Sequence, residues 1–221
     1  MRRRRFLTST LALGGAGLAP SAALARRLFP ADVTDRYVIS QGDREVGRQE
    51  FSFRRGPGGF TVESTIEVRF VSPSFGETTY AHVSRETWDT GWLQSLESET
   101  HIGDRHQVVH AVREAGSLKI SGSDVRAFQV SNYVIPSNLW HRDSRLVRAF
   151  IDVESGNLIS VQARYAGKES LRQGGAAVEA HRYTIRGQLE REAWYDADCV
   201  LVRWDLPLTG GGWINFRHQT A

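Results

Sequence analysis

The sequence predicts an all-β protein, with a single curved antiparallel β-meander that forms an open or half β-barrel and has little helix. A hairpin pattern occurs three times, at Glu86–Leu93, Phe150–Leu158 and Glu192–Leu201: an apolar run, an Asp that starts a turn, then Leu or Val starting the next run. The stretch Phe60–Val71 alternates apolar and polar residues, which is typical of a half-buried strand. About a dozen such strands recur roughly every 8 to 12 residues, which favours a barrel or sandwich over a parallel α/β sheet.

The first 25 residues have the pattern of an export signal. Arg2–Arg5 are charged, Phe6–Ala19 are weakly apolar, and Ala23-Leu24-Ala25 is a cleavage site of the A-x-A type. The run Arg3–Leu7 resembles a twin-arginine signal, with an ordinary Sec signal as the alternative.

Export defines the expected domain organisation. We expect cleavage near Ala25, a linker over 26–35 and one antiparallel β domain over 36–221, in a periplasmic or secreted protein. The export machinery is then a partner of the signal. No Cys follows the cleavage site, which argues against a lipoprotein anchor, and the single Cys199 excludes an internal disulfide.

Removal of the signal also changes the charge. The whole chain has 28 basic and 25 acidic residues, but four arginines lie in the signal, so 24 basic residues remain against 25 acidic ones, a net charge of −1. This balance does not support a nucleic-acid partner. After the signal, no apolar stretch reaches the roughly 18 residues of a membrane-spanning helix.

The elements of the first half follow from alternation and from turn residues. Turns are expected at Gly42-Asp43, at Gly56–Gly59, at Asp89–Gly91 and at Gly103-Asp104, where the last would set His101 opposite His106. The predicted strands are two within Arg36–Phe53, then Phe60–Val71, Thr78–Trp88, Trp92–Thr100, Gln107–Arg113 and Leu118–Ile120.

The second half begins with the least regular segment, Ser123–Arg145, where we expect a short helix or a capping loop. Its portion Ser131–Arg142 is predicted to be a lid. The remaining strands form a hairpin within Arg145–Tyr165, a hairpin within Lys168–Tyr183 that turns at Gly174-Gly175, a further hairpin within Tyr183–Leu206, and a last strand at Trp213–Phe216.

These motifs resemble an uncharacterised bacterial exported all-β family, a domain of unknown function. The matching residues cover nearly all of the chain after the signal: Gly42-x-x-x-Val46-Gly47, Phe51-x-Phe53, Tyr80, Glu86-x-Trp88, Gly91-x-Leu93, Ser98-x-Thr100, Pro136-x-x-x-Trp140, Tyr183-x-Ile185-x-Gly187 and Trp194-Tyr195-Asp196. This resemblance implies no activity. More distantly, the Trp-Asp-turn-Leu hairpins resemble the periplasmic lipoprotein-carrier (LolA/LolB-like) superfamily, whose half-barrels hold acyl chains.

One residue departs from the family pattern. A Gly usually follows Trp-Tyr-Asp-x-x, whereas this chain has Cys199 there. If the turn requires a positive φ, the Cys side chain costs roughly 1 kcal/mol.

A metal site is a weak alternative. His106-Gln107-Val108-Val109-His110 is similar to the H-E-x-x-H zinc helix, but Gln107 cannot act as the base, and on a strand the two His lie roughly 13 Å apart. His101 and His106 form a second possible pair, which His82 or Glu99 could complete. We expect polar cross-strand neighbours rather than a metal shell; the alternative is a metal-dependent hydrolase using His101, His106 and His110.

Other catalytic chemistry is not indicated. Ser137 lacks the G-x-S-x-G context of a nucleophile elbow, and no Gly-rich phosphate loop precedes a helix. We therefore expect a non-catalytic protein without a cofactor.

The aromatic residues carry the remaining functional signal. Trp88, Trp140, Trp194 and Tyr195 are predicted to line the concave face of the sheet and to bind an apolar or lipid-like ligand. The alternative is that the tryptophans are core residues and that the protein is a structural or interaction module of the cell envelope, whose partner is an envelope protein.

Overall fold

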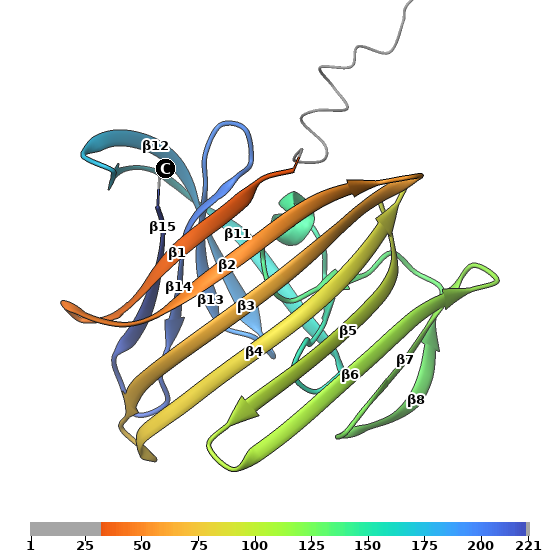
Figure 1. Cartoon of the computed structure of the whole chain (residues 1–221). Helices are drawn as coiled ribbons and strands as arrows, with labels where there is room; N and C mark the ends of the chain where they lie inside the picture. Colours follow the sequence, from red (N-terminus) through yellow and green to blue (C-terminus); the bar gives the residue numbers. More distant parts are fainter. Residues whose placement is uncertain (1–31, 220–221) are drawn as a thin grey trace, which may run out of the picture.

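The chain forms one large antiparallel sheet in a computed structural model that describes residues 32–219. Figure 1 shows that the sheet is strongly curved, so that one of its faces is concave. The predicted signal Met1–Ala25 lies outside the described residues. Among the described residues, no helix is long and apolar enough to cross a membrane.

The sheet has fifteen strands in the order β8-β7-β6-β5-β4-β3-β2-β1-β15-β14-β13-β12-β11-β10-β9. It is open, because β8 and β9 end it without pairing with each other, and only the β9–β10 pair is parallel. The elements are β1 (Thr34–Gln41), β2 (Arg44–Gly56), β3 (Gly59–Ser72), β4 (Gly76–Asp89), β5 (Trp92–Ile102), β6 (Arg105–Glu114), β7 (Ser117–Gly122), β8 (Val125–Val130), β9 (Ile135–Pro136), the 3₁₀ helix η1 (Arg142–Arg145), β10 (Ala149–Ile151), β11 (Leu158–Gln173), β12 (Ala176–Gly187), β13 (Arg191–Tyr195), β14 (Leu201–Pro207) and β15 (Trp213–Gln219).

The predicted fold class is confirmed, since residues 32–219 form an antiparallel meander with one short 3₁₀ helix. Turns occupy Gly42-Asp43, Thr90-Gly91, Gly103-Asp104 and Gly174-Gly175, where Gly residues adopt positive φ at little steric cost. β1 begins at Thr34 rather than at Arg36, inside the stretch expected to be a linker.

Alternation along β3 separates the two faces of the sheet. Phe60, Val62 and Ile66 are buried on the concave face, whereas Glu63 and Glu67 are exposed on the outer face. The same period of two continues on β4 and β5, whose inward residues include the polar His82, Ser84 and Glu86 as well as Trp88 and Leu96.

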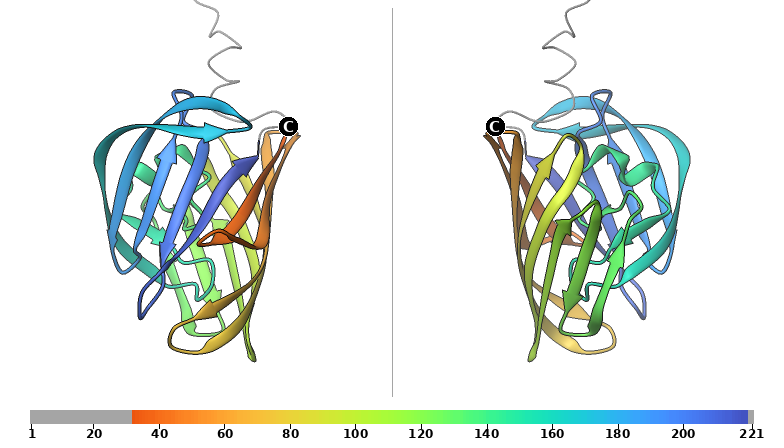
Figure 2. Two further views of the ribbon diagram at one scale, coloured as in Figure 1. Left: turned by 90° about the vertical axis from the view of Figure 1, so that its left-hand side faces the viewer. Right: turned by 90° about the vertical axis from the view of Figure 1, so that its right-hand side faces the viewer.

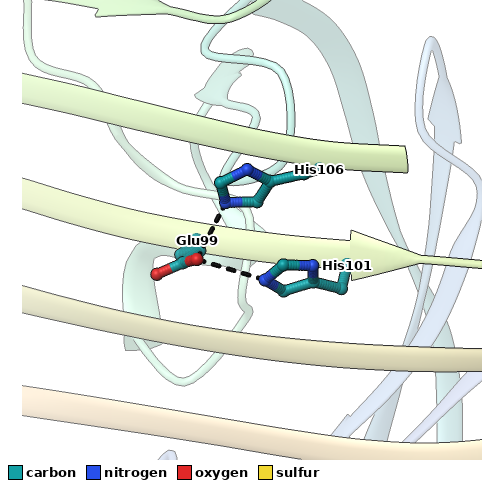
Figure 3. Close-up of side chains that lie close together, drawn as sticks. All are labelled: Glu99, His101 and His106. Carbon is teal, nitrogen blue, oxygen red and sulfur yellow. Dashed lines mark hydrogen bonds and ion pairs between the residues drawn. The ribbon is translucent and has the colours of Figure 1, made fainter. Parts of the chain in front are cut away.

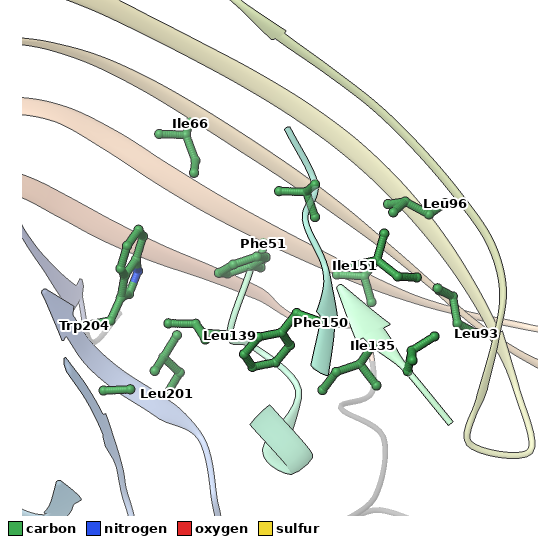
Figure 4. Packing of buried hydrophobic residues seen from close by; sticks show 14 of the residues in the cluster. Phe51, Ile66, Leu93, Leu96, Ile135, Leu139, Phe150, Ile151, Leu201 and Trp204 are labelled. Atoms are coloured by element: carbon green, nitrogen blue, oxygen red, sulfur yellow. The ribbon is translucent and has the colours of Figure 1, made fainter. Parts of the chain in front are cut away.

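The concave side is filled by the chain itself. The segment Ser131–Asn157, called the inner segment below, contains β9, η1 and β10 and buries Ile135, Leu139 and Phe150. Figure 4 shows these side chains among buried residues of the sheet, which include Phe51, Leu93 and Leu201, and all belong to one cluster. The residues predicted to form a lid, Ser131–Arg142, therefore belong to the interior.

A row of small residues lets the inner segment approach the sheet. Ser64, Ser84 and Ser98 are register partners on β3, β4 and β5, and all three are buried. Ser98 Oγ donates a hydrogen bond of 2.6 Å to the carbonyl oxygen of Val153. Larger side chains in this row would push the inner segment away.

The end of the sheet formed by β11–β15 bends further. The long hairpin of β11 and β12 curls over one end of the molecule, as Figure 2 shows. Its tip is held near β15, because Gln173 Nε2 lies 2.5 Å from Nδ1 of His218. This curl encloses a second small apolar cluster of Ala180, Trp194 and Val202, with Leu171 packed against it.

The loop between β13 and β14 contains the residue that departs from the family pattern. Cys199 has a φ of 65°, in the region that favours Gly. We expect Cys199→Gly to raise the melting temperature by about 2 to 4 °C, since relief of roughly 1 kcal/mol of backbone strain has an effect of that size in a domain of this length.

The control separates strain from side-chain contact. Cys199 Sγ lies 3.1 Å from Nη2 of Arg145, and Cys199→Ala removes this contact while keeping the strained φ. Differential scanning calorimetry should therefore give an unchanged or lower melting temperature for Cys199→Ala. No rise in Cys199→Gly would show that the contact outweighs the strain.

Candidate functional site

Two of the predicted ligand-binding residues meet in the interior. The Trp88 and Trp140 rings lie 5.5 Å apart in an edge-to-face arrangement, and Trp140 also packs edge-on against Phe53 and Phe60. Trp88 is almost fully buried. Because one ring comes from β4 and the other from the inner segment, the pair fastens that segment to the sheet.

A buried carboxylate joins the same two elements. Glu86 accepts hydrogen bonds from Trp88 Nε1 at 2.7 Å, from Trp140 Nε1 at 3.2 Å and from Asn138 Nδ2. Burial raises the pKa of Glu86 to about 7, against the three hydrogen bonds, which lower it. No Lys or Arg forms a described ion pair with this carboxylate, so the three N–H donors are the described groups that stabilise its charged form.

Glu86 was missed by the sequence reasoning, although a signal was present. It is in phase with His82 and Ser84, which the alternation of β4 placed on one face. A charged residue on a buried face requires a polar partner. The partner comes from residues 52 and 54 positions away, which no local pattern indicates.

Trp194 and Tyr195 lie on opposite faces of β13. Tyr195 is buried in the interior, where its hydroxyl donates to the carbonyl oxygen of Leu139 at 2.9 Å. Trp194 belongs to the small outer cluster, with the guanidinium groups of Arg182 and Arg203 at 5.4 and 4.3 Å from its ring. The four predicted residues therefore do not form a single wall, since successive side chains of a strand point to opposite faces.

The outer face beside Trp194 is hollowed. This Trp194 hollow has a volume of about 610 Å³ and extends to Trp213 on β15. Glu192 forms ion pairs with Arg182 and Arg186 at this hollow, and Arg203 forms one with Asp205. Trp194 Nε1 donates a hydrogen bond of 2.8 Å to Glu169. The charges that line the hollow are thus largely paired with one another.

An apolar surface continues from this hollow around one end of the sheet. Trp213 is 42% exposed, Val71 49% and Phe75 83%. Gln41 connects the hollow to the β3–β4 turn, because its side-chain amide exchanges two hydrogen bonds with the backbone of Val71 at 2.7 and 3.0 Å. We call Val71, Phe75 and Trp213 the aromatic end.

The aromatic end combines the β3–β4 turn with the adjoining ends of β3 and β15. Ser74 Oγ donates to the carbonyl oxygen of Thr209 at 3.3 Å, which holds the β3–β4 turn against the β14–β15 turn. Gly210 lies so close to Pro73 that a Cβ atom there would be 2.9 Å from that ring. Phe75 is therefore exposed on a turn that its neighbours fix in place. Phe75 lies between the predicted strands Phe60–Val71 and Thr78–Trp88, and the sequence analysis did not single it out.

Two histidines and a glutamate lie together on the outer face of the β5–β6 hairpin. As predicted, His101 and His106 are register partners, and their rings stack at 4.4 Å. Glu99 Oε1 lies 3.1 Å from His101 Nε2 and 2.8 Å from His106 Nε2 (Figure 3). We call Glu99, His101 and His106 the histidine cluster.

The other residues considered for a metal lie elsewhere. His110 is the register partner of Glu97 further along β6 and lies outside the cluster. The structure therefore brings His101 and His106 together with Glu99, one of the two residues considered for completing the pair, and not with His110. His82 points into the interior, where Nδ1 lies 2.8 Å from Oγ1 of Thr100.

The fold and these surfaces define an all-β protein, a barrel-like open sheet whose interior is filled by its own chain. The chain belongs to the family described as Domain of unknown function (DUF6134), whose model matches residues 37–219. The expected membership of an uncharacterised family is therefore confirmed.

A solved structure shares the fold. It is described as the crystal structure of a beta-barrel-like protein of domain of unknown function DUF1849 from Brucella abortus, with a TM-score of 0.58 and 9% sequence identity, covering 84% of this chain and 94% of that chain. A search of the curated proteins gave no match. The resemblance to the lipoprotein carriers is not confirmed by these comparisons.

Proposed function

We propose that the protein is a non-catalytic module of the cell envelope, exported to the periplasm or secreted, that binds a protein partner through its aromatic end. The observation that supports this proposal is the exposure of Phe75, on a turn held in place by its neighbours, and of Trp213, at the start of β15, beside a hollow lined by Trp and Arg. Exposed apolar patches with polar rims commonly mark interaction sites, and Trp and Arg are enriched among residues that dominate binding energy.

The filled interior supports the choice of an outer surface. A lipid-like ligand on the concave face would have to displace the inner segment, which Glu86 and Ser98 bind by hydrogen bonds. Quenching of the tryptophan fluorescence by fatty acids, together with a lipid that copurifies from the native host, would instead support a lipid-like ligand on the concave face.

Site-specific photo-crosslinking in the native host tests the proposal. A photoreactive amino acid in place of Phe75 is expected to give one discrete adduct, recovered in the periplasmic or secreted fraction. The same amino acid in place of Leu146, which is 67% exposed but lies beside η1, is the control and should give none. Equal labelling at both positions, or no adduct at position 75, would contradict the proposal.

Substitution of the exposed side chains then measures their contribution. With the partner identified from the adduct, Phe75→Ser and Trp213→Ser are each expected to weaken binding about 30-fold, the effect of losing roughly 2 kcal/mol at an aromatic anchor. Both residues are exposed, so the variants should keep the circular dichroism spectrum of the native protein.

A further inference from the structure

The histidine cluster has the geometry of a metal site. One ligand atom from each of the three residues can be chosen so that all lie within 4.8 Å of one another, and both Nε2 atoms approach the same oxygen of Glu99. Ligand atoms around a four-coordinate zinc ion stand about 3.3 Å apart, given bonds of about 2.0 to 2.2 Å. The observed separations of 2.8 and 3.1 Å between Glu99 and the two rings are close to this value, so small side-chain rotations admit an ion.

The backbone holds the three residues in place. His101 and His106 are opposite each other on the β5–β6 hairpin, one residue pair away from the two-residue turn Gly103-Asp104. Two strands closed by so short a loop have a fixed register, and directly opposite residues have Cβ atoms about 5 Å apart. The ring pair is therefore set by the fold and does not depend on a chance approach of two surface side chains.

The neighbours of Glu99 direct its carboxylate along the strand. Its register partners are Val83 on β4 and Val108 on β6, which offer no polar atoms on either side.

The surroundings leave room for an ion and its remaining ligands. The register partner of His101 on β4 is Ala81, whose side chain is small, and all three members of the cluster are exposed. Glu99 also lines an outer hollow of about 420 Å³ between β3 and β6. Three protein ligands leave at least one coordination position for water or for a group of another molecule.

We propose that Glu99, His101 and His106 bind one divalent late transition-metal ion of the zinc class on the outer face of the β5–β6 hairpin. Two imidazole nitrogens and one carboxylate suit Zn²⁺, Cu²⁺, Ni²⁺ or Co²⁺, whereas Mg²⁺ and Ca²⁺ prefer sites made of oxygen alone. The site is separate from the aromatic end, and its test uses no protein partner, so the two proposals succeed or fail independently.

Isothermal titration of the purified chain, stripped of metal by a chelator, tests the inference with ZnCl₂ as the probe. The expected result is one ion per chain. In His101→Gln and in His106→Gln, zinc should bind at least about tenfold more weakly than in the unmodified protein. His110→Gln is the matched control, because His110 is an exposed histidine of the same strand outside the cluster, and it should bind zinc like the unmodified protein. Circular dichroism of each variant verifies folding, which substitutions at these exposed positions should preserve.

Three outcomes would overturn the inference. One is zinc affinity that stays the same in His101→Gln and His106→Gln. Another is equal loss in His110→Gln, which would indicate a different ligand set. The third is an equal response to MgCl₂ and ZnCl₂, since a site built from two imidazoles must discriminate between these ions.

Discussion

Glu86→Leu is expected to lower the free energy of unfolding by about 3 kcal/mol or more. The substitution removes the acceptor for the side-chain N–H groups of Trp88, Asn138 and Trp140, and each donor left without a partner in the interior costs about 1 to 3 kcal/mol. Urea denaturation followed by tryptophan fluorescence measures the change.

A neighbouring glutamate provides the control for this prediction. Glu97 lies on β5 and is exposed on the outer face, so Glu97→Leu should change the free energy of unfolding by less than about 0.5 kcal/mol. Similar losses in both variants would contradict a structural role for the buried carboxylate.

The stability contribution of Glu86 should also depend on pH. Its pKa in the folded protein, about 7, exceeds the value of about 4.3 that is usual for an unfolded chain, so folding favours the protonated form. This contribution is fully present below about pH 4 and is lost as the pH rises through about 7. Asn138 Oδ1 has no described hydrogen-bond partner. A rotation of the Asn138 amide would let this oxygen accept a hydrogen bond from the protonated carboxyl group of Glu86.

The difference in unfolding free energy between the native protein and Glu86→Gln measures this dependence. It should decrease by roughly 2 to 3 kcal/mol between about pH 5 and pH 8. Burial lowers the pKa of His82 and of His141 to about 4, so these residues reduce stability as the pH falls below about 6.5. Both are present in the two proteins, and their effect cancels in the difference. A difference that does not change with pH would show that Glu86 stays in one protonation state.

Gly47→Ala is expected to destabilise the protein by about 3 kcal/mol or more, because the space for a side chain is taken by the backbone of the next strand. A Cβ atom at Gly47 would lie 2.1 Å from the carbonyl oxygen of Glu67 and 2.7 Å from Cα of Val68. β2 and β3 would have to separate to admit it. Chemical denaturation of the variant measures the loss.

Gly56 is the matched control for this substitution. It lies on the same strand, and a Cβ atom there would have no neighbour within 4 Å. Gly56→Ala should therefore be neutral or stabilise slightly, by up to about 1 kcal/mol, because alanine restricts the unfolded chain. If the two variants lose equal stability, the close approach of β3 does not explain the Gly of the Val46-Gly47 motif.

Much of the fold could be predicted from the sequence, because the alternation and the turn residues that define a hairpin lie close together in the chain. The Gly103-Asp104 turn set the register that places His101 opposite His106, and period-two alternation separated Phe60 from Glu63. The same alternation places Trp194 and Tyr195 on opposite faces once β13 is recognised, so the error of assigning both to one wall was avoidable.

The site predictions failed where they depended on contacts between distant residues. Glu86 gains its partners from Asn138 and Trp140, and the aromatic end forms because the turn at Ser74 lies against Thr209, far away in the chain. A pattern of residue types shows that a buried carboxylate needs donors, but it does not show which segment supplies them.

The sequence by itself determined that this protein is an antiparallel meander with Gly-containing turns, since strand period and turn chemistry are local properties. Only the tertiary structure decided that the inner segment Ser131–Asn157 fills the concave side and that Phe75 and Trp213 stay outside. The physical reason is that burial depends on which surfaces meet after the sheet has curled. Any apolar segment that packs on the concave side removes its apolar area from water, and in this protein that segment is Ser131–Asn157 of the same chain.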